Sequence, residues 1–282
     1  MKLAVIKLLA LLLPAAAAFS QDSLLVVFWN VENFFDYRSE AAPQYWTRGR
    51  FYAKCDAVAK TLMRISDACG RFPDIVGFAE VENSFVMRSM VSSTLLRKLG
   101  YRIVHYESPD HRGIDCGLIY REPSLRLRGS GPKHVCDSSG AAMATRDILL
   151  AEFDGLAVLV NHHPSKIGGK SDRREAAMAR MLEVKDSLLA AGCPRVLAIG
   201  DFNEELWPDA EQGTLKYNGG WEKIDGWFGF GEFAVEEKVF ADPVLLTPDK
   251  AFGGMKPRRC FVGPRYEGGV SDHLPIVLTV TF

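Results

Sequence analysis

The sequence lacks three features that would each indicate a class of protein. No two of its six cysteines form a CxxC pair, which excludes a zinc ribbon and a thioredoxin-type site. The sequence has 34 Lys and Arg and 35 Asp and Glu, which gives a net charge of −1. It therefore lacks the excess of positive charge that tight, non-specific nucleic-acid binding requires. Beyond residue 20 no apolar run is long enough to span a membrane, and no internal repeat is present.

The six cysteines do not indicate a disulfide scaffold. Their number is even, but their spacing matches no small disulfide-rich fold. Several stand in apolar surroundings, as Cys116 does in IDCGLIY, where buried free thiols are expected.

Residues 1–20 have the pattern of a secretory signal peptide. A basic start, with Lys2 and Lys7, is followed by LLALLLPAAAAFSQ, an apolar stretch with small residues before Gln21. We expect cleavage before Gln21, with a retained membrane anchor as the alternative. The mature chain, residues 21–282, has the length and composition of one globular domain. It is expected to be a secreted or periplasmic monomer.

Apolar runs and helical patterns alternate irregularly along the chain. Strands are predicted at the start (LLVVFWN, 24–30) and in seven later runs: PDIVGFAE, YRIVHYE, DCGLIYR, RDILLAEF, LAVLVNHH, RVLAIGDFN and HLPIVLTVTF. Helical spacing occurs over about 50–68, 85–99 and 171–191, and residues 207–239 read as loop with short elements. This mixed order predicts two packed sheets with helices outside.

Five apolar runs have polar residues of similar chemistry at one end. Any one of them has an ordinary reading as a turn or solvated residue. Together they indicate a site, because strand ends on one edge of a sandwich meet in space. The residues are Asn30, Glu80, Asn161, His162, His163, Asp201, Asn203, Ser271, Asp272 and His273.

In the order FWNVENFFD, FAEVEN, NHHPSK, GDFNEE and SDHLP, these motifs resemble the endonuclease/exonuclease/phosphatase superfamily, over about residues 24–282. The form near the start looks like a secreted bacterial branch. The resemblance implies an α+β fold, a four-layer αββα sandwich of two packed mixed β-sheets flanked by helices. It also implies cleavage of a phosphate ester with Mg²⁺ or Mn²⁺, hard cations that prefer oxygen ligands.

The resemblance also implies roles for single residues. Asn30 and Glu80 would hold the metal ion, although Glu82 would share the face of Glu80 in an extended segment and could replace it. His273 would be the general base on the attacking water, with Asp272 beside the metal site. His162 would contact the phosphate. Asp201 and Asn203 would orient the nucleophile and the phosphate.

The family also draws on a carboxylate between GDFN and SDH to fix the tautomer of the base. Asp225 in KIDGWFG is the best candidate and Asp242 in FADPV the rival. Three further residues are expected to bind substrate, namely Asn161, Arg174 and Lys166, and Asp115 is a possible support of the site. The basic run 256–259 (KPRR) is expected to be a solvated loop rather than a docking site.

The sequence therefore predicts a secreted, divalent-metal-dependent phosphoesterase, foremost an endonuclease or other phosphodiesterase. Its substrate would be a phosphodiester, in nucleic acid or in a phospholipid. Within hydrolases, the alternatives are a phosphomonoesterase and a sphingomyelinase-like phospholipid phosphodiesterase, which the aromatic segment 221–233 keeps open. The alternative from another class is a non-catalytic binding module, which the retained motif residues disfavour.

Overall fold

The computed structural model describes residues 22–282 apart from 41, 138, 167–170, 209 and 211. The signal peptide expected at 1–20 thus lies outside the described residues. Within the described part, no helix is both long and apolar enough to cross a bilayer. All six cysteines are free thiols, and Cys55, Cys116 and Cys260 are buried as expected.

Two mixed sheets form the centre of the molecule. The first has the order β12 (Ala234–Val239), β17 (Ile276–Thr281), β1 (Ser23–Phe34), β2 (Ile75–Val81), β4 (Asp115–Arg121) and β3 (Tyr101–His105). The second has the order β11 (Asp225–Gly231), β8 (Arg195–Asp201), β7 (Leu156–His162), β6 (Ile148–Phe153) and β5 (Leu127–Lys133). Among the described strands, only β1–β2 and β7–β8 pair in parallel, so the ends of these four strands bring their polar residues to one edge.

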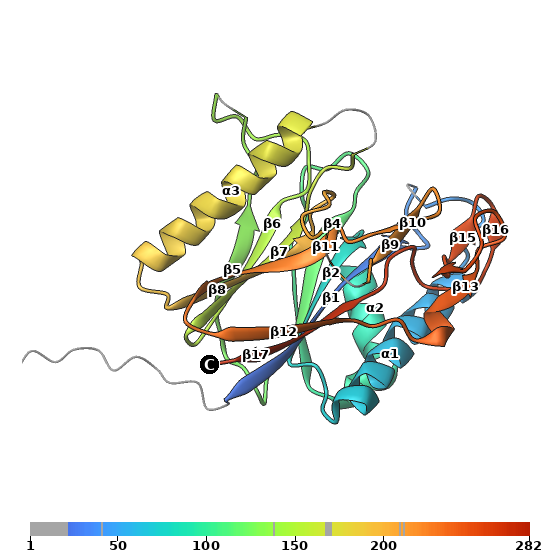
Figure 1. Cartoon of the computed structure of the whole chain (residues 1–282), viewed down its shortest axis with the longest axis horizontal. Helices are drawn as coiled ribbons and strands as arrows, with labels where there is room; N and C mark the ends of the chain where they lie inside the picture. Colours follow the sequence, from blue (N-terminus) through green and yellow to red (C-terminus); the bar gives the residue numbers. More distant parts are fainter. Residues whose placement is uncertain (1–21, 41, 138, 167–170, 209, 211) are drawn as a thin grey trace, which may run out of the picture.

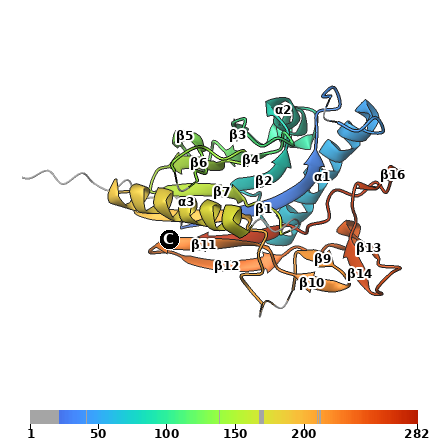
Figure 2. The ribbon, with the colours of Figure 1, turned by 90° about the horizontal axis from the view of Figure 1, so that it is seen from above.

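Helices cover the outer faces of both sheets, with α1 (Arg48–Cys69) and α2 (Ser84–Ser92) on one side and α3 (Ser171–Ala190) on the other (Figures 1 and 2). Side-chain alternation explains this layering. In β7, Val158 and Val160 join the core between the sheets, whereas Ala157 and Leu159 pack with α3. The predicted four-layer αββα sandwich is confirmed.

Capping residues fix the ends of α1 and the start of α2. The Thr47 side chain accepts a hydrogen bond from the Arg50 amide and caps α1, which ends at Gly70 in the left-handed conformation. The Asn83 side chain caps α2 by accepting from the amides of Phe85 and Val86. Asn83 therefore turns the chain from β2 directly into a helix, three residues after Glu80.

Three short hairpins gather at one end of the sandwich, on the right of Figures 1 and 2. They are β9 (Leu215–Tyr217) with β10 (Gly220–Glu222), β13 (Leu246–Pro248) with β14 (Met255–Pro257), and β15 (Phe261–Val262) with β16 (Arg265–Tyr266). Two 3₁₀ turns, η1 (Leu95–Lys98) and η2 (Pro243–Leu245), complete the described elements.

Two predictions of local structure were wrong. The helix expected over 85–99 ends at Ser92, because Thr94 caps the separate 3₁₀ turn η1. The segment 207–239, predicted to be loop with short elements, contains β11 and β12, which are full strands of the two sheets. Glycines weaken the strand signal in β11, but Phe228 packs against Phe202, and this tertiary contact outweighs local propensity.

Gly200 tests how closely β7 and β8 must approach. A Cβ at this position would lie 2.6 Å from both the backbone oxygen and the Cβ of Asn161. Because a backbone atom cannot give way cheaply, we expect Gly200→Ala to lower the free energy of unfolding by about 1–3 kcal/mol. Urea unfolding measures this change. Gly131→Ala is the matched control, since its Cβ would meet nothing within 4 Å, and an equal loss in both variants would contradict the close-approach argument.

Candidate active site and metal centre

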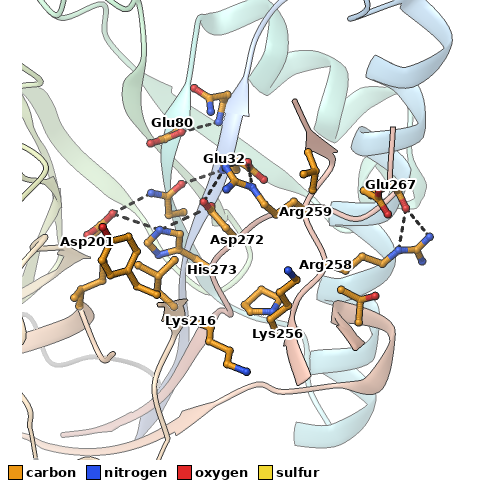
Figure 3. A pocket seen from close by; sticks show the side chains of 18 of the residues that line it. Glu32, Glu80, Asp201, Lys216, Lys256, Arg258, Arg259, Glu267, Asp272 and His273 are labelled. Carbon is orange, nitrogen blue, oxygen red and sulfur yellow. Dashed lines mark hydrogen bonds and ion pairs between the residues drawn. The ribbon is translucent and has the colours of Figure 1, made fainter. Parts of the chain in front are cut away.

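A cavity of about 740 Å³ opens where the polar strand ends meet the short hairpins. Its lining includes seven of the residues predicted for the site: Asn30, Glu80, His162, Asp201, Asn203, Asp272 and His273. The strands β1, β2, β7 and β8 supply Asn30, Glu80, His162 and Asp201, Asn203 follows β8, and the segment before β17 supplies the last two. Figure 3 shows Glu80, Asp201, Asp272 and His273 facing one part of this space.

His273 is held against the end of β1 by two side chains. The Ser271 hydroxyl donates to the Asn30 carbonyl over 2.6 Å and accepts a hydrogen bond from the His273 amide at 3.0 Å. The Trp29 indole N–H donates to the His273 carbonyl at 2.9 Å. The SDH motif is therefore joined to FWN, although 241 residues separate Ser271 from Asn30.

Asp225 orients the ring of His273. One carboxylate oxygen lies 2.7 Å from Nδ1, which leaves Nε2 directed to the cavity. Burial alone would lower the pKa of His273, but Asp225, Asp201 and Asp272 outweigh it and raise the pKa well above the usual value. The rival, Asp242, instead caps η2 through the Val244 amide and pairs with Arg64.

Asp201 connects the two sheets at the base of the cavity. Its Oδ2 accepts a hydrogen bond from the Asn30 amide at 3.0 Å and lies 3.7 Å from Nε2 of His162. Burial and the neighbouring Asp225 raise its pKa, against the lowering effect of His273. The pKa of His162 is lowered well below its usual value by burial and then by Arg146, so its ring is neutral at physiological pH.

Glu80 offers one carboxylate oxygen to the cavity. Its Oε2 accepts from the Asn33 amide at 2.7 Å, while Oε1 lies 3.7 Å from Nε2 of His162 and has only a long ion pair with Arg112. Glu82 turns away and accepts from the Asp36 amide. The two acids do not share a face because Glu80 adopts a left-handed backbone with φ of 64°, which breaks the strand alternation.

Left-handed backbone is concentrated at this site. Of the five non-glycine residues with positive φ, four line the cavity: Glu32, Asn33, Glu80 and Asn203. Such a conformation costs about 1–3 kcal/mol for each residue. A glutamate side chain does not offset this cost by local hydrogen bonds to its own backbone. The surrounding structure must therefore hold Glu32 and Glu80 in this conformation.

Glu32 and Arg259 are two cavity residues that the sequence analysis missed. Arg259 binds Glu32 Oε1 and lies 3.2 Å from Asp272 Oδ2, while Glu32 Oε2 is buried without a hydrogen-bond partner among the described residues. Burial raises the pKa of Glu32 to about 7, with Asp272 adding to the rise and Arg259 and Lys54 opposing it. Glu32 lies two residues after Asn30 in the same motif, but nothing in the local sequence indicates that its side chain enters the cavity.

The donor set fits a hard divalent cation. Glu80 Oε1, the buried Glu32 Oε2 and the carboxylate of Asp272 leave negative charge around one side of the cavity, and Asn30 adds an amide oxygen. Oxygen ligands of this kind suit Mg²⁺ or Mn²⁺. Asp201, Asp225 and His273 also lie within mutual reach. An ion there would compete with the Asp225–His273 hydrogen bond, so we assign the cation to the Glu80 side.

A buried arginine supports the histidine segment from behind. Arg146 donates to the carbonyls of His162 and His163 and pairs with Asp110 at 3.0 Å. Asn203 joins the same segment, donating to the His163 carbonyl at 2.8 Å. The ring of His163 itself packs against Phe202 in a T-shaped contact and does not line the cavity.

The three predicted substrate-binding residues do not line the cavity. Asn161 is fully buried on the face of β7 opposite His162, where its amide donates to the carbonyls of Leu159 and Ile199. Arg174 donates to the Ser165 carbonyl, and Lys166 pairs with Glu222 at 2.8 Å. Strand alternation explains the position of Asn161, and local pairing explains those of Arg174 and Lys166. Asp115 also lies outside this lining.

The basic run 256–259 was expected to be a solvated loop, but its first residues belong to β14. Lys256, Arg258 and Arg259 line the cavity. In Figure 3, Lys256 and Arg258 lie on the side away from Glu80 and Asp201. Lys250 joins this side from the turn between β13 and β14. The cavity therefore has an acidic end and a basic wall, which we define as Lys250, Lys256 and Arg258.

Residues 25–228 match the model of the endonuclease/exonuclease/phosphatase family, and the chain belongs to this family. Its members include metal-dependent phosphoesterases, so the chain is assigned at that level to hydrolases that use divalent metals. None of the curated proteins compared matches the sequence closely enough to suggest a relative.

Solved structures show the same fold at low sequence identity. A mannosyl-6-phosphatase from Bacteroides thetaiotaomicron is 17% identical with a TM-score of 0.61, over 92% of this chain and 100% of that one. TDP2 from C. elegans is 14% identical with a TM-score of 0.60, over 92% and 75%. The human Nocturnin catalytic domain is 15% identical with a TM-score of 0.58, over 93% and 94%.

The titration of His273 tests the assignment of its partner. Asp225→Asn removes the largest cause that raises the His273 pKa, so burial should then dominate and the pKa should fall. The measurement is an NMR titration of the imidazole in metal-free protein. Asp242→Asn is the matched control and should leave the His273 titration unchanged. A fall in the control, or none in Asp225→Asn, would refute the assignment.

Proposed function

We propose that the chain is a secreted, divalent-metal-dependent phosphodiesterase that hydrolyses an anionic phosphodiester, foremost in a nucleic acid. The observation that carries this is the hydrogen-bonded Asp225–His273 pair, which faces a cavity with carboxylates at one end and the basic wall at the other. A general base and a cation site side by side are what in-line hydrolysis of a phosphate ester requires.

The acidic end supplies the metal ligands. Glu80 and Asn30 would hold the ion, with Glu32 and Asp272 close by. When bound, the cation would neutralise charge on the phosphate oxygens and activate water. Mg²⁺ and Mn²⁺ both suit this oxygen set.

The histidines and Asp201 would act on water and phosphate. With Nδ1 held by Asp225, Nε2 of His273 faces the cavity. A bound cation would oppose the carboxylates that raise the His273 pKa, and the neutral ring would then accept a proton from the attacking water. Neutral His162 and the Asp201–Asn30 pair face the same space, where a ring N–H can donate to a phosphate oxygen. Asn203 also lines this cavity, with its side-chain amide bound to the His163 carbonyl and its backbone N–H bound to Asp201 Oδ1.

The basic wall favours a substrate that carries negative charge beyond the reacting phosphate. Lys250 has no ion-pair partner among the described residues, and Arg258 donates only to the Glu267 carbonyl. Lys256 lies 3.6 Å from Asp249, whose charge is already shared with the buried Lys216. These cations can therefore bind a second anionic group, as a neighbouring phosphate of a polynucleotide would present.

A phospholipid phosphodiesterase is the second candidate, supported by exposed apolar side chains near the cavity. Tyr217, Trp221, Phe252 and Met255 lie exposed on the hairpins β9–β10 and β13–β14, with Phe252 exposed to 62%. Most aromatics of the segment 221–233 do not contribute, since Trp227, Phe228 and Phe233 pack in the hydrophobic clusters. Exposed apolar groups beside a charged cavity are found at lipid-binding sites.

The first test is hydrolysis of bis(p-nitrophenyl) phosphate beside the monoester, with Mg²⁺, with Mn²⁺ and with chelator. We expect chelator-sensitive cleavage of the diester, reduced by at least about 100-fold in His273→Ala because the general base is lost. His134→Ala is the matched control, since it also breaks a His–Asp pair, with Asp147, outside the cavity.

Full metal-dependent activity in folded His273→Ala would refute the proposed mechanism. A preference for the monoester would instead identify a phosphomonoesterase that uses the same site. No turnover of either compound by folded protein would favour the non-catalytic binding module.

The basic wall has its own test. Lys250→Ala combined with Lys256→Ala should raise KM for a single-stranded oligonucleotide several-fold and reduce the salt dependence of binding. The same variant should hydrolyse bis(p-nitrophenyl) phosphate at the wild-type rate, because that substrate has one charge. Lys98→Ala, an exposed lysine on η1, is the control. Unchanged oligonucleotide kinetics together with cleavage of phospholipid vesicles would favour the second candidate.

A further inference from the structure

A second group of potential metal ligands lies outside the catalytic cavity. His105 is the last residue of β3, Asp115 is the first residue of β4, and Glu107 stands in the loop that joins them. One ligand atom from each lies within 4.8 Å of the others. None of the three lines the catalytic cavity.

Two of these side chains are buried with unpaired polar atoms that face each other. Nε2 of His105 and Oδ2 of Asp115 are 3.6 Å apart, which is too long for a hydrogen bond, and each side chain is only 2% exposed. Neither atom has a hydrogen-bond partner in the part of the chain that the structure describes. A buried unpaired polar atom costs about 1–3 kcal/mol, so the pair calls for a ligand between them.

The surroundings of both buried groups favour the binding of a cation. Burial, with a smaller contribution from Arg88, lowers the pKa of His105 to about 4, so its nitrogen lone pair is available at neutral pH. Burial raises the pKa of Asp115 to about 7; the Ser108 amide opposes this rise, and Glu107 and Asp110 add to it. Burial and Glu82 also raise the pKa of Glu107. A bound cation would relieve this unfavourable accumulation of carboxylates.

We propose that His105, Glu107 and Asp115 bind a divalent transition-metal ion of the Zn²⁺ or Mn²⁺ type, at a site separate from the catalytic centre. One imidazole with two carboxylates is a ligand set that suits these ions better than Mg²⁺, which prefers oxygen alone. Because Glu107 is exposed, water can complete the coordination from the solvent side.

The ion would fix the loop that approaches the active site. The chain between His105 and Asp115 carries Arg112, which donates to Asn33 Oδ1 at 2.9 Å and lies 3.7 Å from Glu80 Oε1. It also carries Asp110, which pairs with Arg146, the residue that donates to the carbonyls of His162 and His163. A metal ion that joins both ends of this loop would therefore stabilise Arg112 and Arg146 without touching the substrate.

The test counts bound Zn²⁺ in four proteins: wild type, Glu80→Gln, His105→Ala and the double variant. Each is incubated with Zn²⁺, dialysed and analysed by mass spectrometry of the metal. We expect His105→Ala to lose one ion relative to its parent, both in the wild type and in the Glu80→Gln background. The exposed His111 gives the matched control, His111→Ala, which should lose none.

A conservative variant covers the case in which His105→Ala does not fold. Glu107→Gln changes an exposed side chain and should fold normally, yet it should weaken Zn²⁺ binding in calorimetry by about tenfold or more, since even changes around metal ligands cost that much. Equal Zn²⁺ content in wild type and folded His105→Ala, or unchanged affinity in Glu107→Gln, would overturn the proposal. Neither outcome depends on hydrolysis, so the test is independent of the proposed function.

Discussion

The active site depends on the hydrogen bonds of Trp29 and Ser271, which join the end of β1 to the segment that carries His273. The Trp29 indole binds the His273 carbonyl, and the Ser271 hydroxyl bridges the Asn30 carbonyl and the His273 backbone N–H, so β1 fixes the backbone of His273. The second sheet then completes the arrangement, since β11 delivers Asp225 to the ring and β8 delivers Asp201 to Asn30. The geometry of the site therefore depends on the packing of the two sheets, because each sheet contributes residues that position the others.

Much of the fold could be predicted because strong periodic patterns agree with the packing. The β7 run LAVLVNHH reads as a strand from its letters alone, and its two buried faces explain why it is apolar throughout. The segment that contains β11 and β12, which are edge strands of the two different sheets, could not be predicted in this way. Glycines and exposed charges weaken its local signal, and contacts such as Phe228 with Phe202, distant in sequence, stabilise it.

The motif residues of the site could also be predicted, whereas its supporting charges could not. His273 and Asp201 stand in short recognisable strings, and the structure brings them to one cavity. Arg259 stood in a basic run that resembles any solvated loop, and only the three-dimensional path of β14 brings it to Glu32. Asn161 shows the converse error, because membership of a motif does not reveal which face of a strand a residue occupies.

The left-handed backbone at Glu32 and Glu80 lowers the stability of the fold at two positions where the proposed metal site needs a carboxylate. Glycine would adopt these φ values without strain, and either replacement would also remove a buried carboxylate that is costly without a cation. A library of variants sorted for heat resistance alone, in the absence of metal, would therefore enrich for proteins that have lost their acidic end. Engineers who want a more robust protein from this scaffold should keep both positions unchanged and select on bound metal as well as on folding.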